Sequence, residues 1–341
     1  MTDYNVSDWA YAYGGPSGQG QIKTQTDDFV VEELLSFTPE GSGEHVFLYL
    51  EKSGENTEYV ARLLARHAGV RQRDIGFAGL KDRHGRTRQW FSIWLPGKDD
   101  PDWRQLQTDK LKILQIVRHT RKLKRGALSG NRFDILIRNL QADTDQIEQQ
   151  LNQIKIGGFP NYFGEQRFGH QGRNLNAALA MFQGVKVKRE QQSIYLSAVR
   201  SYLFNLILSE RVSQHTWNQA MSGDVFNLNH THSSFVPEHY DQILDERLAV
   251  ADIHPTGVLW GKGDSRVSAD AAAIEQQVIA GHEDFADGLI KAGLEVDRRA
   301  LRAMPESLSW QFTAENCLRL SFVLPAGSYA TVLLREIVKT T

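Results

Sequence analysis

Residues 75–95 read IGFAGLKDRHGRTRQWFSIWL and carry the strongest local pattern in the chain. The apolar runs Ile75–Ala78 and Gln89–Leu95 predict two strands, and the polar residues Asp82–Gly85 between them predict a turn. This pattern favours a fold built around a sheet, with the carboxylate of Asp82 in a turn between two of its strands.

Further strands are predicted on both sides of this segment, the first two because apolar and polar residues alternate there and the last two because they bracket the basic run. They cover Phe29–Leu35, His45–Leu50, Lys112–Val117 and Phe133–Ile137. Helices are predicted at Thr57–His67, with Thr57 as N-cap, and at Asp143–Ile154. The first half of the chain is therefore of mixed α/β type.

The pattern changes beyond Pro160. Leu196–Leu208 and Ala269–Ile279 have helical periodicity, whereas Cys317–Val323 and Tyr329–Ile337 return to strand-like or buried apolar runs. An apolar segment at the end of a chain must be buried, and the N-terminal sheet is the expected surface.

A length of 341 residues also favours two domains. We therefore predict an α/β (α+β) fold with a mixed sheet in a domain built from both chain ends, residues 1–158 and 305–341. A second α/β domain, residues 159–304, is predicted to be inserted between them.

The composition is that of an ordinary globular protein, with 41% hydrophobic and 23% charged residues. The single cysteine, Cys317, excludes a disulfide within the chain and favours a reducing, cytoplasmic setting. The N-terminus lacks the pattern of a signal peptide, and no apolar stretch approaches the roughly 18 residues that span a bilayer. We expect a soluble cytoplasmic protein with no membrane partner and no obligatory protein partner.

A basic run stands out against the formal net charge of −2. No Asp or Glu occurs from Lys110 to Phe133, and five cations fall within eight residues: Arg118, Arg121, Lys122, Lys124 and Arg125. Such a run can be a solvated face. Because like charges repel, however, it favours an anionic partner such as a nucleic acid.

Several catalytic and metal motifs are absent from the sequence. There is no G-x-S-x-G serine motif and no H-E-x-x-H zinc motif. His230, His232 and His239 lack metal-ligand spacing and are interpreted as surface residues. We therefore expect neither a metal nor a cofactor.

Asp82 is the candidate catalytic residue. Aspartate at such a position often caps its own turn, and that interpretation stays open. Two features favour a catalytic role for Asp82 instead. Gly76 and Gly79 leave room for close approach to the backbone, and the cations Lys81, Arg83 and His84 would keep the carboxylate ionised.

The segment resembles the catalytic motif of TruD-type pseudouridine synthases, in which the aspartate of G-x-K-D is the nucleophile. Four further blocks are similar to this family in the same order. They are DFVVE at 28–32, preceded by Lys23, then GALSGNRF at 126–133, PNYFGEQRFG at 160–169 and LPAGSYAT at 324–331. The tyrosine at 329 departs from the phenylalanine expected there.

The resemblance implies a cofactor-free isomerase that turns a uridine in the D arm of tRNA, at position 13, into pseudouridine. It implies Asp82 as nucleophile, and Lys23 as the cation paired with it, with Lys81 as a second candidate. Substrate-binding roles are implied for Phe29, Lys81, Asn131, Phe133 and Tyr329. The basic residues Arg118, Arg121, Lys122, Lys124 and Arg125 are expected to bind the RNA backbone.

Two other functions stay open at this point. An RNA-binding protein that catalyses no reaction would account for the basic run and the aromatic residues. A hydrolase could also use an aspartate nucleophile. The sequence does not decide whether Asp82 attacks the ribose or the base.

Overall fold

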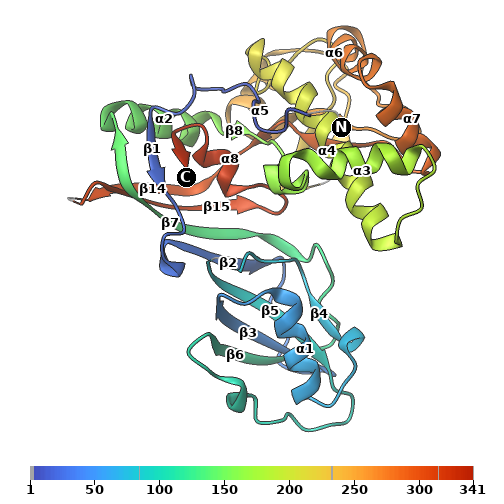
Figure 1. Ribbon diagram of the computed structural model, residues 1–341. Coiled ribbons are helices and arrows are strands. Elements are labelled where there is room, and N and C mark those ends of the chain that lie inside the picture. Colours follow the sequence, from blue (N-terminus) through green and yellow to red (C-terminus); the bar gives the residue numbers. More distant parts are fainter. Residues whose placement is uncertain (1–3, 84, 232, 314, 341) are drawn as a thin grey trace. The chain divides into compact units, whose positions relative to one another are not determined.

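The computed structural model describes residues 4–83, 85–231, 233–313 and 315–340. The chain separates into two compact units (Figure 1). The sheet unit comprises 18–143, 305–327 and 339–341, and the helical unit comprises 1–17, 144–304 and 328–338. This grouping by internal packing differs from the predicted division into 1–158 plus 305–341 and 159–304, which concerns family domain boundaries and stays a prediction.

The sheet unit is built on one long mixed sheet. Its main strands follow the order β14-β15-β7-β2-β5-β3-β6. Their bounds are β14 (Glu306–Thr313), β15 (Cys317–Pro325), β7 (Leu128–Ala142), β2 (Phe29–Leu35), β5 (Arg86–Trp94), β3 (His45–Ser53) and β6 (Leu111–His119). The short strand β4 (Ile75–Phe77) pairs with β5, and β1 (Gly18–Gln21) pairs with β7 and with β16 (Val338–Thr340).

The strand directions confirm the predicted mixed sheet. Strand β2 is parallel to β5, with Val31 opposite Thr87, and antiparallel to β7, with Val31 opposite Phe133. The predicted segment Cys317–Val323 lies in β15, which pairs with β7. One C-terminal run therefore joins the N-terminal sheet, as its apolar sequence predicts.

Helix α1 (Thr57–His67) packs against the sheet near β3 and β5 (Figure 1). Its apolar face, including Val60 and Leu64, forms a core with Leu48, Phe91 and Ile93. The N-cap is Asn56, whose side-chain oxygen accepts from the Tyr59 amide at 2.7 Å, so the prediction of Thr57 as N-cap was wrong. Thr57 is buried, and its hydroxyl donates to Gln89 Oε1 at 3.0 Å.

The sheet unit also contains three short 3-10 turns: η1 (Thr26–Asp28), η2 (Gln72–Asp74) and η3 (Trp103–Leu106).

The helical unit surrounds a smaller sheet with the order β10-β9-β11-β12. Its strands are β9 (Phe226–Leu228), β10 (Ser234–Phe235), β11 (Ile253–Leu259) and β12 (Asp297–Ala300), with β8 (Phe159–Pro160) and β13 (Arg302–Ala303) forming a separate pair. Its helices are α2 (Thr144–Gly157), α3 (Arg173–Phe182), α4 (Arg189–Ser213), α5 (Gln242–Ala249), α6 (Ala269–Ala280), α7 (Glu283–Lys291) and α8 (Ala330–Leu334), with the turns η4 (Glu165–Arg167) and η5 (His170–Gly172).

Helix α4 is the centre of this unit and packs on β11 and α6. Gly257 of β11 allows the close approach, because a Cβ there would lie 3.1 Å from the Phe204 ring of α4. The predicted helices Leu196–Leu208 and Ala269–Ile279 lie within α4 and α6. The segment Tyr329–Ile337 contains helix α8, whose residues Val332–Leu334 are buried, so its burial was predicted but its helical form was not.

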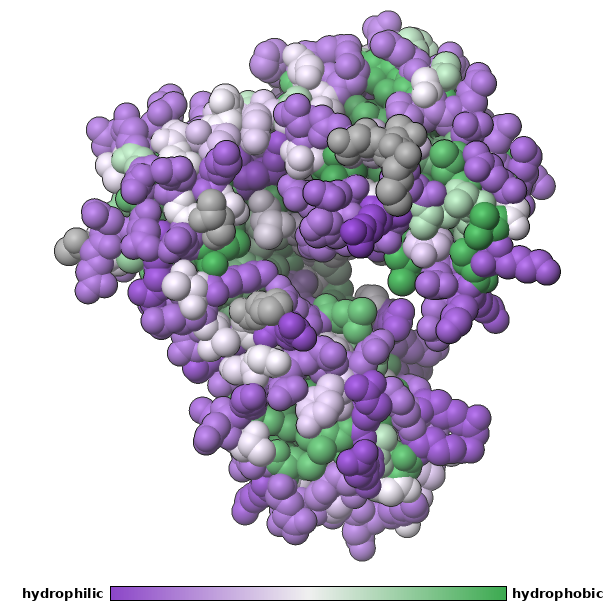
Figure 2. All heavy atoms as spheres, viewed as in Figure 1, coloured by the Kyte–Doolittle hydropathy of each residue, from purple (hydrophilic) through white to green (hydrophobic). Residues whose placement is uncertain are grey.

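Most of the surface in view is polar. Figure 2 shows mainly hydrophilic residues, interrupted by small hydrophobic patches, on the face that it presents. Among the described residues, none of the helices has the length and apolar character needed to cross a bilayer.

Candidate active site

Asp82 follows β4 in the sheet unit and is accessible, with 38% of its side chain exposed. The ammonium of Lys23 lies 2.5 Å from its Oδ2, which makes a charge-assisted hydrogen bond. Lys23 has a φ of +58°, a backbone conformation that is strained for residues other than glycine. The chain thus keeps a strained lysine where its side chain can reach this carboxylate.

Lys23 also approaches an aromatic ring. Its Nζ lies 4.5 Å from the centroid of Phe29, at the start of β2. Phe29 is buried, and its neighbour Asp28 forms an ion pair with Arg138 at 2.7 Å. The hydrogen bonds from Arg138 lower the pKa of Asp28 although burial raises it, so Asp28 stays ionised and fixes the start of β2.

Lys81 contacts other groups, although it directly precedes Asp82. Its ammonium lies 2.9 Å from Oε1 of Glu33 and donates to Oδ1 of Asn131 at 2.7 Å. Glu33 and Asn131 are opposite each other on β2 and β7. Of the two lysines considered as partners of Asp82, it is Lys23 whose ion pair the structure contains.

The two glycines that precede Asp82, Gly76 and Gly79, differ in the space beside their backbone. A Cβ on Gly76 would lie 2.4 Å from the Leu123 carbonyl oxygen and 2.5 Å from Ser92 Oγ, so the space beside Gly76 is taken by the chain itself. The close approach expected at Gly76 is therefore made by another segment of the chain and not by a ligand. Gly79 has nothing within 4 Å of such a Cβ, and its side of the backbone is open.

Phe133 lies among other aromatic rings in β7. It stacks on Phe322 of β15 with centroids 5.4 Å apart, and it forms a T-shaped pair with Phe29 with centroids 6.3 Å apart. Phe133 is buried in this arrangement. A base stacked on Phe133 would therefore need a ring face that Phe322 does not cover.

The basic residues around Arg118–Arg125 have different environments. Arg118 pairs with Asp100 at 2.5 Å, and Lys122 donates to the Arg73 carbonyl oxygen at 2.5 Å. Arg121, Lys124 and Arg125 are exposed. The loop packs beside β4, because Leu123 is buried and its amide donates to Ser92 Oγ, and the Gly126 amide donates to the Ala78 carbonyl oxygen. Three exposed cations thus lie next to the strand that leads to Asp82.

Tyr329 belongs to the helical unit. Its hydroxyl accepts from Arg167 at 2.9 Å, and its ring meets Phe163 with centroids 6.3 Å apart. Gly164 brings the chain close to this ring, since a Cβ there would lie 3.0 Å from Tyr329 Cδ1. The block 160–169 and the block 324–331 therefore meet around Tyr329.

Three buried polar residues near Asp82 were not predicted from the sequence: Glu33, Lys52 and Gln89. Burial lowers the pKa of Lys52 to about 8, although the charges of Asp82 and Glu33 raise it. Glu33 had a signal that could have revealed it. Phe29, Val31 and Glu33 share the buried register of β2, so a carboxylate occurs where the alternation demands an apolar residue.

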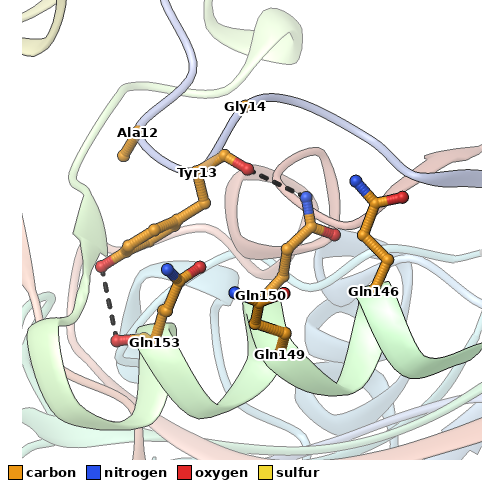
Figure 3. A pocket seen from close by; sticks show the side chains of 7 residues that line it. All are labelled: Ala12, Tyr13, Gly14, Gln146, Gln149, Gln150 and Gln153. Carbon is orange, nitrogen blue, oxygen red and sulfur yellow. Dashed lines mark hydrogen bonds between the residues drawn. The ribbon is translucent and has the colours of Figure 1, made fainter.

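A hollow of about 350 Å³ occurs in the helical unit (Figure 3). It is lined by residues of the N-terminal segment and of α2: Ala12, Tyr13, Gly14, Gln146, Gln149, Gln150 and Gln153. The amide of Gln150 donates to the Tyr13 and Gly15 carbonyl oxygens, which fixes the segment on the helix. The glutamine amides that line this hollow are neither nucleophiles nor proton donors suited to catalysis.

No group of three or more potential metal ligands occurs in the part of the chain that the structure describes. His230 and His239 are exposed, whereas His232 and the motif residue His84 lie outside the described residues.

The chain is similar to one family over most of its length. The family model described as tRNA pseudouridine synthase D (TruD) matches residues 6–185 and 170–337. The tRNA pseudouridine synthase D of Methylococcus capsulatus is 47% identical over 330 residues, covering 96% of this chain and 93% of that protein. Its counterpart in Aeromonas hydrophila is 47% identical over 331 residues, covering 97% and 94%.

A solved structure has the same fold. The crystal structure of a TruD protein from Methanosarcina mazei matches with a TM-score of 0.72 and 22% identity, covering 98% of this chain and 96% of that one.

Proposed function

Because the chain belongs to the tRNA pseudouridine synthase D family, we propose that Asp82 is the nucleophile with which it isomerises a uridine of tRNA. Membership fixes the class of enzyme, a tRNA pseudouridine synthase. The nucleophile and the roles of the residues around Asp82 are proposals that rest on the site's geometry, whereas the position of the uridine is a proposal that rests on the family resemblance. The ion pair between Lys23 and Asp82 is the observation that carries the assignment of the nucleophile.

The reaction needs a group that can add to the nucleotide and leave again. The Asp82 carboxylate forms a covalent bond to the ribose or to the base, and the C1′–N1 glycosidic bond breaks. The base turns, C5 bonds to C1′, and the bond to Asp82 breaks, which releases the carboxylate. C5 then loses its proton and N1 gains one, so the product is an isomer of the substrate. No electrons are exchanged.

Lys23 is proposed to orient the Asp82 carboxylate through the ion pair. A protonated Asp82 would be a poor nucleophile, and a cation 2.5 Å away favours the ionised form. The same lysine lies against the Phe29 ring, which positions the pair beside the aromatic wall of β2. A uridine must leave its stack to reach such a site, because a base cannot be turned inside a helix.

The remaining residues are proposed to bind the substrate. Phe29 and Phe133 would form aromatic walls for the uracil, and Asn131 would bind its edge. Tyr329, in the helical unit, would also bind the substrate. Lys81 would act through Asn131. The cations Arg118, Arg121, Lys122, Lys124 and Arg125 would bind phosphates of the tRNA, with the exposed ones contributing most. We place the target at position 13 in the D arm, and the action of the enzyme in the cytoplasm, where tRNA is the available substrate.

Tritium release from tRNA labelled at C5 of uridine tests this proposal. An isomerase of this kind exchanges the C5 hydrogen, whereas an RNA-binding protein or a hydrolase does not. We expect release from tRNA, with pseudouridine found at position 13. Tight binding without release would refute the proposal, and release at another uridine would refute the assigned position.

A further inference from the structure

Glu33, Lys81 and Asn131 form a chain of contacts inside the sheet unit. Glu33 is completely buried, and the side chain of Lys81 is only 10% exposed. The Lys81 ammonium lies between Glu33 Oε1 at 2.9 Å and Asn131 Oδ1 at 2.7 Å. Because Glu33 and Asn131 face each other across β2 and β7, both side chains project from the same face of the sheet.

This chain of contacts determines which way the Asn131 amide points. An ammonium has three donors and no acceptor, so the atom of Asn131 that faces Lys81 must be the oxygen. The NH₂ group then points away from Lys81, and it can only donate. A reversed amide would place two donors against a cation that is itself a donor.

The buried carboxylate keeps Lys81 in this position. Glu33 accepts from the Trp90 amide at 3.0 Å and from Gln89 Nε2 at 3.3 Å, so two hydrogen bonds from β5 hold its carboxylate oxygens in place. Burial raises the pKa of Glu33, and the charge of Lys81 opposes that rise.

The same network supports the backbone that leads to Asp82. Gln89 Nε2 donates to the Gly79 carbonyl oxygen at 2.7 Å, and the Lys81 amide donates to Thr57 Oγ1 at 3.0 Å. The Thr57 hydroxyl donates in turn to Gln89 Oε1 at 3.0 Å. The groups that orient Asn131 are thus rigidly connected to the turn that carries the nucleophile.

We propose that Glu33 and Lys81 are positioning residues that hold the Asn131 amide as a donor to O4 of uracil, and so select uridine over cytidine. The inference rests on the proposed function, in which a flipped base lies beside Asp82. Uracil carries a carbonyl oxygen at C4, which accepts a hydrogen bond. Cytosine carries an amino group there, which would meet the Asn131 NH₂ donor to donor and leave both unpaired.

The test compares the affinity of two tRNAs that differ only in carrying uridine or cytidine at the converted position. Turnover is blocked by working in Asp82→Asn chains. We expect the uridine tRNA to bind at least about tenfold more tightly, since one mismatched donor–acceptor pair typically costs that much or more. The cost of unpairing each base from its partner in the tRNA is the same for every variant. The decisive quantity is therefore the change in the uridine/cytidine ratio between variants.

Asn131→Asp is the first variant. Its carboxylate stays next to Lys81 but can only accept, so we expect the uridine preference to disappear or reverse in favour of cytidine. An unchanged ratio in this variant would overturn the inference.

Glu33→Gln is the second variant, because it keeps the shape and removes the charge that holds Lys81. We expect the ratio to fall several-fold while the affinity for the cytidine tRNA changes little. The matched control is Glu51→Gln, which removes a largely buried carboxylate of β3 that pairs with Arg88 at 2.9 Å. If the control lowers the ratio as much as Glu33→Gln does, the effect is general loosening and the inference fails.

A double variant decides the matter if Glu33→Gln does not fold. Glu33→Gln combined with Lys81→Met leaves no buried charge unpaired and should fold more readily. Its Asn131 is free to present either atom, so the preference should fall as well, and a preserved preference would overturn the inference. Failure of the proposed function would appear differently, as a wild-type chain that makes no pseudouridine whatever its base preference.

Discussion

Replacing Lys52 by methionine should stabilise the protein at neutral pH. Lys52 lies near the end of β3 with 1% of its surface exposed, and its ammonium donates to the Glu55 carbonyl oxygen at 2.7 Å. Burial lowers its pKa from 10.5 to about 8 despite the nearby charges of Asp82 and Glu33. That shift corresponds to about 3 kcal/mol at roughly 1.4 kcal/mol per pH unit.

The sign follows from proton binding. The unfolded chain binds the Lys52 proton more tightly than the folded chain does, so the free energy of unfolding should rise with pH between about 8 and 10.5. Below about 8 the full penalty is present. Methionine has a similar length and no charge, and it loses only the hydrogen bond to Glu55, worth about 1 kcal/mol. We therefore expect Lys52→Met to be about 2 kcal/mol more stable than wild type at pH 7.

Urea unfolding of both proteins from pH 7 to pH 10.5 measures this difference. The stability advantage of Lys52→Met should shrink steadily above about pH 8. Lys112→Met, at an exposed position of β6, is the control and should show no such trend. A methionine variant that is less stable than wild type at pH 7, with a pH-independent difference, would refute the assignment of Lys52 as a destabilising buried cation.

Three further predictions follow from the site and from α1. Phe133→Leu keeps apolar volume but removes the π face, so it should lower pseudouridine formation at least tenfold while lowering stability by only about 1 kcal/mol; activity that falls only in step with the melting temperature would favour a core role. Neutralising Arg121, Lys124 and Arg125 together should weaken tRNA binding and flatten its dependence on salt, and unchanged binding at low and high salt would identify a merely solvated loop. Asn56→Ala removes the cap of α1 and should destabilise the protein by about 1 kcal/mol in urea unfolding, without changing tRNA affinity.

The sequence was sufficient to predict the elements whose signals are local. Alternation identified β2, and the helical period identified α1 and much of α4, because burial against one face imposes those periods directly on the residues. Strands β3 and β5 were predicted as well, although both of their faces are largely buried. The segment Tyr329–Ile337 shows where this fails. A short, fully buried apolar run has no polar face to report its period, and it contains the helix α8.

The site was predicted only in part for a related reason. Asp82 and Lys23 belong to recognisable motifs, so they could be named. The choice of Lys23 over Lys81 as the partner of Asp82 depends on the ion pair of Lys81 with Glu33 and on its hydrogen bond to Asn131. Those contacts join residues from three separate segments of the chain. No local pattern encodes them, although a carboxylate in the buried register of β2 was a sign that some cation had to face it.

Conversion of the target uridine by Asp82→Asn tests the central claim most directly. Asparagine is nearly isosteric with aspartate, so the turn should persist, but the amide is not a comparable nucleophile and cannot form the ion pair with Lys23. Melting temperature, tRNA affinity and pseudouridine formation should be measured on one preparation. We predict a folded protein that binds tRNA at least as tightly as wild type and forms no detectable pseudouridine. Conversion near the wild-type rate would show that Asp82 is not the nucleophile.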